Sequence, residues 1–234
     1  ETPGHSPVYR NTAQPDELTP NIPGLTTLHD LFENAVNLFG DDDCLGERLL
    51  SKGKLDSFYT YQTYNEINER RLHFASGLIR FVTSLDKYDA GKYTDKRTGK
   101  PNFVVSLSGQ NSIQMLLVDL STRSFSLPNC GLYDSLSDSN CNYILSVTES
   151  PVLILNKVLI EKFLIIKEKF NFKSLICLVC FEDLLEESEK DQELTQKCKS
   201  KGVKLTDFKA VEKLGRKHTL SNDYNLPSPD TLYT

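Results

Sequence analysis

The chain has 234 residues and a mass of 26.5 kDa, enough for one large domain or two small ones. Hydrophobic residues make up 38% and charged residues 25%, which is typical of a globular protein and excludes a largely disordered one. The net charge of −5 argues against a general nucleic-acid binder, whose surface is basic. No apolar run approaches the ~20 residues that span a bilayer. The six cysteines are too irregularly spaced for a disulfide framework, so an intracellular, reducing compartment is expected.

The chain opens with a proline-punctuated, polar stretch that has almost no apolar periodicity. It predicts an extended arm over residues 1–25 and shows no secretory signal. Thr27 and Asp30 have the spacing of a capping box, in which each residue satisfies a backbone N–H of the other. They predict the start of a helix that ends near Gly40.

Two strand-like runs follow this helix, and the longest helical pattern in the chain comes after them. Residues 44–50 and 55–61 predict a hairpin, and residues 63–83 carry apolar side chains at helical spacing. The charged stretch 86–100 predicts a solvated loop. We therefore expect residues 26–101 to form a helix, a hairpin and a long helix that pack on the core.

From residue 102 onward, short apolar strands alternate with helical segments. The predicted strands are 103–107, 125–129, 152–155, 174–180 and 204–206. The predicted helices are 112–123, 139–148, 158–170, 182–199 and 207–214. Strands with a helix in every gap imply right-handed crossovers and a largely parallel sheet. We predict an α/β fold in which residues 102–234 form a doubly wound subdomain, with helices on both faces of a largely parallel sheet.

Cys177 and Cys180 have CxxC spacing, which suggests a redox or zinc site. A redox pair normally opens a helix, and a zinc site needs further ligands at set spacing. Here the flanking residues are apolar and strand-like, so the two side chains should point to opposite faces of a strand. We interpret them as core cysteines.

Other candidate sites have simpler structural explanations. The segment Ser108–Ser112 lies between a strand and a helix, where backbone N–H groups bind anions, yet Ser and Asn are also preferred helix caps. We favour capping. Asp41–Asp43 predicts a solvated turn, and the acidic run Glu182–Glu193 predicts the exposed face of a helix. The chain has no phosphate-loop, dinucleotide, nucleophile-elbow or HExxH motif.

Several segments, in order, resemble the long-chain acyl-CoA synthetases, AMP-forming ligases of the adenylate-forming superfamily. In that family a strand leads into a Leu-Tyr-Asp-Thr-Leu-Gly turn, a helix and an apolar strand. The matching segments here are Gly131–Leu136, Asn142–Leu145 and Pro151–Ile154. Further agreement comes from Asp43–Gly46, Phe58–Tyr64, Ala75–Leu78 and Pro227–Thr234. The resemblance extends over about Leu25 to Thr234 and is strongest to the yeast-type peroxisomal branch.

The resemblance implies a two-step reaction for a parent protein. A fatty carboxylate attacks the α-phosphate of ATP with Mg²⁺ present, giving acyl-adenylate and pyrophosphate, and the thiol of CoA then displaces AMP. The family's phosphate loop should begin just after Thr234, so the chain is expected to be an incomplete amino-terminal subdomain, inactive alone. We expect none of ATP, Mg²⁺ and CoA to bind tightly to it. The implied location is peroxisomal or on the cytoplasmic face of a membrane, with at most peripheral membrane contact and no nucleic-acid partner.

The resemblance places no catalytic, cofactor-binding or metal-binding residue within the chain. Four residues match the family's turn, and we expect them to have a structural role: Leu132, Tyr133, Asp134 and Ser135.

Two alternatives remain open at this stage. The chain could be a stand-alone α/β binding or regulatory module that has no ATP site. It could instead be a peripheral membrane protein, because the helix at 158–170 is apolar, although burial against a sheet explains that helix better. The first alternative is decided by whether the reading frame continues past Thr234 into a Ser/Thr/Gly-rich loop with a lysine.

Overall fold

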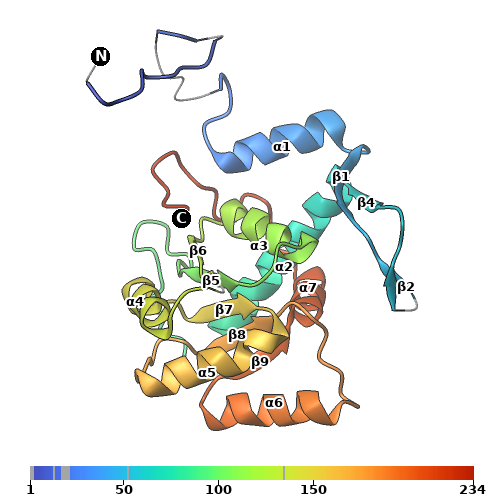
Figure 1. Ribbon diagram of the computed structural model, residues 1–234, viewed down its shortest axis with the longest axis vertical. Helices are drawn as coiled ribbons and strands as arrows, with labels where there is room; N and C mark the ends of the chain where they lie inside the picture. The colour runs from blue at the N-terminus through green and yellow to red at the C-terminus, as the bar shows by residue number, and fades with distance from the viewer. Residues whose placement is uncertain (1–2, 13, 17–21, 52, 134) are drawn as a thin grey trace.

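A computed structural model describes residues 3–234 except 13, 17–21, 52 and 134. Its centre is a five-stranded sheet with the order β6-β5-β7-β8-β9 (Figure 1). All four strand pairs are parallel. In sheet order the strands are Asn129–Gly131 (β6), Val105–Ser108 (β5), Val152–Leu155 (β7), Cys177–Cys180 (β8) and Lys204–Asp207 (β9).

Helices cover both faces of this sheet, so the predicted doubly wound fold is confirmed. One face packs on three helices: α2 (Tyr64–Thr83), α3 (Ile113–Ser124) and α7 (Phe208–Lys217). The other face packs on α4 (Asp138–Thr148), α5 (Ile160–Lys169) and α6 (Glu189–Ser200). A short 3₁₀ turn, η1 (Lys157–Leu159), precedes α5, whose Ile160, Phe163, Leu164 and Ile166 are buried. The apolar helix at 158–170 therefore packs on the sheet, as expected.

The strands contribute alternate residues to two separate hydrophobic clusters. Val152 and Ile154 of β7 belong to the cluster with α2, α3 and α7, while Leu153 and Leu155 belong to the other. In β8, Cys177 faces the first cluster and Cys180 the second. This is the period of two of a strand buried on both faces. It confirms that the CxxC cysteines are core residues on opposite faces.

The elements that precede the sheet follow the sequence closely. Helix α1 (Leu28–Phe39) begins with the predicted capping box: the N–H of Asp30 donates to Thr27 Oγ1 over 3.0 Å, and the N–H of Thr27 donates to Asp30 Oδ2 over 2.9 Å. The hairpin also forms, with two pairs of antiparallel strands. They are β1 (Asp43–Glu47) with β4 (Thr60–Thr63) and β2 (Leu50–Ser51) with β3 (Lys54–Leu55).

Two glycines allow α2 and α7 to cross at very short range. A Cβ atom on Gly77 would lie 1.9 Å from the carbonyl oxygen of Val211, and one on Gly215 would lie 1.7 Å from that of His73. No side chain fits at such distances. The two glycines therefore bring helix backbones into direct contact.

Three predicted elements were wrong in position. The strand expected at 125–129 begins only at Asn129, because Ser126 has a φ of +55° and the N–H of Leu127 still bonds to Thr122 of α3. The helix expected at 182–199 begins at Glu189, where Ser188 provides the N-cap. Residues 182–188 instead form a loop, so the acidic run is only in part a helix face. The strand expected at 174–180 is shorter, Cys177–Cys180.

Two further segments are more tightly held than the sequence suggests. The expected solvated loop 86–100 is anchored by Tyr93, which is buried and donates from its hydroxyl to the carbonyl of Glu149 over 2.8 Å. Residues 231–234 are not a strand, yet the N–H of Asn129 donates to the carbonyl of Tyr233 over 2.8 Å. That segment therefore lies beside β6.

The expected arm at residues 1–25 falls partly outside the described residues. Its described part contains an isolated bridge between Ile22 and Leu25 but neither helix nor strand. Among the helices that the structure describes, each is too short or too polar to pass through a bilayer.

Candidate functional site at the carboxyl edge of the sheet

The carboxyl ends of β5 and β7 lie side by side, and the chain leaves them toward opposite faces of the sheet. Doubly wound proteins bind ligands at such a switch point. Here Asn156, directly after β7, bridges the two loops. The N–H of Gln110 donates to Asn156 Oδ1 over 2.9 Å, and the N–H of Asn156 donates to the carbonyl of Ser108 over 3.2 Å. Gly109 permits this approach, since a Cβ atom there would lie 2.3 Å from Asn156 Oδ1.

The same edge is linked onward to the loop after β8. Asn156 Nδ2 donates to Glu182 Oε1 over 3.0 Å, and the N–H of Lys157 donates to Glu182 Oε2 over 2.7 Å. Glu182 thus accepts from two consecutive residues after β7. The loops after β5, β7 and β8 form one connected polar edge.

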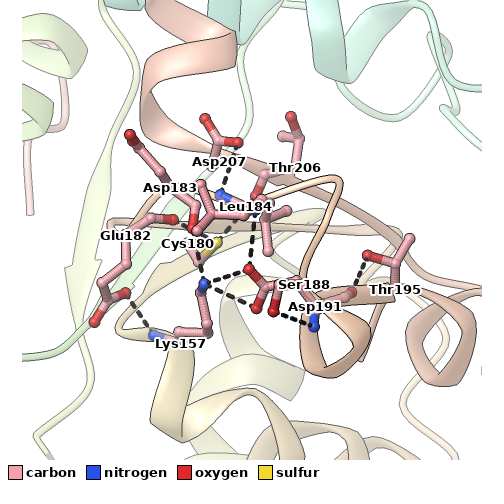
Figure 2. A network of polar contacts seen from close by, with 11 residues as sticks. Lys157, Cys180, Glu182, Asp183, Leu184, Ser188, Asp191, Thr195, Thr206 and Asp207 are labelled. Carbon is pink, nitrogen blue, oxygen red and sulfur yellow. Dashed lines mark hydrogen bonds and ion pairs between the residues drawn. The ribbon is translucent and has the colours of Figure 1, made fainter. Parts of the chain in front are cut away.

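Lys157 is the cation at the centre of this network (Figure 2). Its Nζ donates to both carboxylate oxygens of Asp191, over 2.9 and 3.0 Å, and to the carbonyl of Asp183 over 2.8 Å. Asp191 also accepts from the N–H of Leu185 over 2.9 Å. The hydrogen bond from Leu185, followed by that from Lys157, lowers the pKa of Asp191 below its usual value. All three donors of the Lys157 ammonium are therefore used within the chain.

Cys180 lies under this network and is not suited to be a nucleophile. Its Sγ is 3.1 Å from the carbonyl of Glu182 and 3.5 Å from that of Thr206. Burial, followed by the charge of Asp207, raises the pKa of Cys180 to about 12. A thiol acts as a nucleophile only as the thiolate, so this cysteine is inert at neutral pH.

Three of the four residues singled out from the sequence, Leu132, Tyr133 and Ser135, lie in the loop between β6 and α4, at the same edge of the sheet. Leu132 is buried, its N–H donates to the carbonyl of Leu107 over 2.6 Å, and its carbonyl accepts from Ser108 Oγ over 2.8 Å. Tyr133 and Ser135 are exposed. Asp134 lies outside the described residues. In Ser108–Ser112, Ser112 Oγ accepts from the N–H of Met115 over 3.1 Å, so the capping interpretation is confirmed.

The polar edge does not fit the nucleotide and Mg²⁺ that the resemblance implies. A phosphate cradle needs free backbone N–H groups and a free cation. The N–H of Gln110 is used by Asn156, and the ammonium of Lys157 is used by Asp191 and Asp183. The described residues also contain no cluster of three or more His, Cys, Asp or Glu that could hold a metal ion.

The network depends on Asn156, Lys157 and Asp191, and none of the three was predicted from the sequence as a site residue. Two of them follow directly on the apolar run Val152–Leu155, which is the position where loops of a parallel sheet carry polar contacts. The sequence therefore contained a signal for Asn156 and Lys157. Asp191 was not identifiable, because it was interpreted as one acid of an exposed helical face.

The chain is similar in sequence to curated acyl-CoA ligases. It is 35% identical, over 64% of its length, to 20% of the peroxisomal acyl-CoA ligase 891 of Penicillium roqueforti. It is 28% identical, over its whole length, to 32% of the ligase of the same name from Penicillium brevicompactum. It is 26% identical to long-chain-fatty-acid–CoA ligase 6 of Mus musculus, over 82% of the chain and 24% of the relative. The chain thus spans no more than about a third of these relatives. No protein-family profile matches it.

Solved structures support the fold. The adenylation and carrier didomain of a Segniliparus rugosus carboxylic acid reductase, in complex with AMP, matches 85% of the chain with a TM-score of 0.66 and 17% identity, over 28% of its own length. A putative long-chain-fatty-acid CoA ligase from Rhodopseudomonas palustris matches 86% with a TM-score of 0.53 and 14% identity, over 39% of its length. The sequence is therefore homologous to part of the acyl-CoA ligases, and it folds as part of an adenylate-forming domain does.

Proposed function

We propose that this chain is the amino-terminal part of a fatty acid–CoA ligase that activates fatty acids with ATP. The parent protein would form an acyl-adenylate with release of pyrophosphate and then acyl-CoA with release of AMP. The observation that carries the proposal is the match of the whole chain to a peroxisomal acyl-CoA ligase at 28% identity. Relatives named as peroxisomal occur in Penicillium and in Arabidopsis thaliana, which supports a peroxisomal location. Fatty acid, ATP, Mg²⁺ and CoA are the proposed substrates and cofactors of the parent.

Within that reaction, the chain would supply a scaffold. Its parallel sheet brings the loops after β5, β6, β7 and β8 to one edge, and Asn156 and Lys157 link three of these loops. We propose a structural role for Leu132, Tyr133, Asp134 and Ser135, supported by the backbone bonds of Leu132 to Leu107 and Ser108. No phosphate-loop motif occurs in the 234 residues, so the chain alone should lack the preorganised donors that one such loop provides.

The test is an assay of the complete reading frame beside the 234-residue chain. The complete protein should catalyse palmitate-dependent exchange between pyrophosphate and ATP, and should form palmitoyl-CoA when CoA is added. The 234-residue chain should do neither. A complete protein that binds palmitate or ATP but gives no exchange would contradict the proposal. Exchange by the short chain alone would show that the catalytic groups lie within it.

The alternative is a stand-alone α/β module without an ATP site, and one observation favours it. The donors at the switch point are already paired within the chain. Sequencing the transcript separates the two functions. A natural stop codon at Thr234 would favour the module, whereas a frame that runs into a Ser/Thr/Gly-rich loop with a lysine would favour the ligase.

A further inference from the structure

A group of lysines lies at the edge of the sheet where its strands begin, opposite the polar edge. These lysines line two cavities, of about 420 and about 250 Å³. The larger cavity is formed by residues at or next to the starts of β8 and β9, by α6 and by the loop after α2. Among the described residues, only two acids line either cavity, Asp86 and Glu168. The lysines, which we call the amino-edge lysines, are Lys87, Lys167, Lys173, Lys199, Lys201 and Lys204. This edge therefore carries excess positive charge on a chain whose net charge is −5.

Three of the amino-edge lysines have no acid to balance them. Lys201 pairs with Glu168 over 2.5 Å. Lys173, Lys199 and Lys204 are exposed, and none of them forms an ion pair within the part of the chain that the structure describes. Their ammonium groups are therefore available to an anion from solution.

Helix ends explain only some of these lysines. A lysine in the last turn of a helix stabilises the helix dipole, and this accounts for Lys167 in α5 and Lys199 in α6. Lys87 and Lys173 lie outside the helices, and Lys204 is the first residue of β9. Three separate segments thus add positive charge to this edge for which the helix dipole gives no reason.

The ammonium group of Lys87 is held in the wall of the larger cavity. Its Nζ donates to the carbonyl of Gly202 over 2.8 Å, and both residues line the cavity. Gly202 has a φ of +70°, and a Cβ atom there would lie 2.4 Å from Lys87 Nζ, so a glycine permits this approach. An ammonium group has three N–H donors, and two of them remain for a ligand.

The amino-edge lysines also repel one another. Burial, followed by the charge of Lys87, lowers the pKa of Lys167, whose Nζ donates to the carbonyl of Phe172 over 2.6 Å. A bound anion offsets repulsion between cations, and it does so more strongly when it carries more than one negative charge. The cluster therefore favours a multiply charged anion over a singly charged one.

We propose that the larger cavity binds the phosphate group of a phosphate ester or of a polyphosphate, with Lys87, Lys199 and Lys204 as its cationic contacts. A phosphate ester concentrates up to about two negative charges on one small group, and lysine binds phosphate as a point charge. The same cavity is lined by Leu85, Ile176 and Val203, which can contact a non-polar part of an ester. The site lies at the opposite edge of the sheet from the loops assigned to the ligase scaffold, and it does not depend on the ligase reaction.

The experiment is an NMR titration of the ¹⁵N-labelled 234-residue chain with sodium pyrophosphate at pH 7 and constant ionic strength. The amide signals of Lys87, Gly202 and Val203 should shift in a saturable way, whereas that of Asn156 at the polar edge should not. Acetate carries a single charge and should bind about tenfold more weakly. The absence of saturable shifts at the three amino-edge amides, or equally tight binding of acetate, would overturn the proposal.

A second measurement distinguishes a free phosphate from a lipid headgroup. The chain is sedimented with phosphatidylcholine vesicles that contain phosphatidylinositol 4-phosphate, and with vesicles of phosphatidylcholine alone. Sedimentation only with the phosphorylated lipid, reversed by pyrophosphate, would identify a phosphate presented by a membrane. Saturable pyrophosphate shifts without sedimentation would identify a free phosphate compound. Equal sedimentation with both vesicles would contradict recognition of the phosphate.

Matched variants test whether the cavity, rather than net charge, binds the anion. Lys199→Gln and Lys204→Gln each remove one exposed charge, and each should weaken pyrophosphate binding about threefold. Lys190→Gln is the control, because Lys190 is an exposed lysine of the same helix α6 that lines neither cavity. It should leave binding unchanged. Equal weakening by Lys190→Gln and Lys199→Gln would show that the anion responds only to overall charge, and would contradict the proposed site.

Discussion

The guanidinium of Arg71 on α2 donates a hydrogen bond from Nη2 to the carboxylate of Glu33 on α1. The same guanidinium donates from Nη1 to Ser124 Oγ on α3 and from Nε to Asn68 Oδ1 over 2.9 Å. It also lies 5.1 Å from the ring centre of Phe32. Burial lowers the pKa of Arg71 to about 10, which leaves it protonated at pH 7. One buried cation therefore joins three helices.

Glu33→Leu tests this junction. The substitution leaves the fully buried Arg71 without its counter-charge, and it should lower the free energy of unfolding by about 3 kcal/mol. Urea unfolding at pH 7 measures the change. The matched control is Glu161→Leu, which breaks the exposed pair with Lys197 and should cost no more than about 1 kcal/mol. Equal losses in the two variants would mean that the buried pair is energetically no different from a surface pair.

His29 should make stability depend on pH in the acid range. Its pKa is lowered to about 4 in the folded chain, against about 6.5 in the unfolded chain, so the unfolded state binds the proton first as the pH falls. The contribution of His29 to the free energy of unfolding should be fully present above pH 6.5. It should decline as the pH falls toward 4, by up to about 3 kcal/mol. Urea unfolding at pH 7.0, 5.5 and 4.5 measures this, with His29→Asn as the reference. A parallel decline in both proteins would assign the pH dependence to other groups.

The crossing of α2 and α7 should not tolerate a methyl group. Gly77→Ala places a Cβ atom 1.9 Å from the carbonyl oxygen of Val211, so the helices must separate, at a cost of about 3 kcal/mol or more. Gly215→Ala should have a similar effect for the same reason. Thermal unfolding measures both. Gly131→Ala has no atom within 4 Å of the new Cβ and should shift stability by less than about 0.5 kcal/mol; a melting temperature for Gly77→Ala as high as that of this control would be inconsistent with the crossing.

Lys157 should hold the loop 182–188 in place. Lys157→Met removes the bonds to Asp191 and to the carbonyl of Asp183. The free energy needed to open the loop should therefore fall by about 2 kcal/mol. Hydrogen exchange should then accelerate about 30-fold at the amide of Leu185. Lys190→Met, in the neighbouring α6, is the control. Unchanged exchange at Leu185 would show that the loop is held by its other contacts.

The thiols should fall into two reactivity classes. Cys141, Cys177, Cys180 and Cys198 are buried, whereas Cys44 and Cys130 are partly exposed. Burial raises the pKa of Cys177 and of Cys198, the latter to about 11. An Ellman titration of the folded chain should therefore show two accessible thiols, and six only after denaturation. Rapid reaction of Cys177 or Cys180, located by mass spectrometry, would reopen a redox role for the CxxC pair.

The sequence was most informative where local chemistry decides the structure. Thr27 with Asp30 and Thr63 with Glu66 form capping boxes that fix the starts of α1 and α2, and the first was recognised from spacing alone. The parallel sheet followed from the alternation of apolar strands and helices. These features depend on residues within a few positions of one another.

The parts that were mispredicted depend on partners far away in the sequence. Residues 182–188 have helix-forming acids, yet Glu182 and Asp183 contact Lys157, some 25 residues earlier. The late start of β6 follows from the positive φ of Ser126, and Ser126 Oγ donates to the carbonyl of Asn225, 99 residues away. The buried atoms His29 Nδ1 and Arg123 Nε, which have no hydrogen-bond partner among the described residues, likewise become apparent only after the helices pack. Periodicity contains no information about such contacts.

The alternation of β7 and β8 between two clusters has a mechanical consequence. Each of these four-residue strands contributes side chains to both hydrophobic clusters. If a strand moves when one cluster loosens, its side chains in the other cluster must move as well. A polar substitution at Val179, which disrupts packing in one cluster, should therefore also disrupt the packing of Leu178 and of the helices that cover the other face. The sheet and its six covering helices then melt in a single step, in the manner of one indivisible unit.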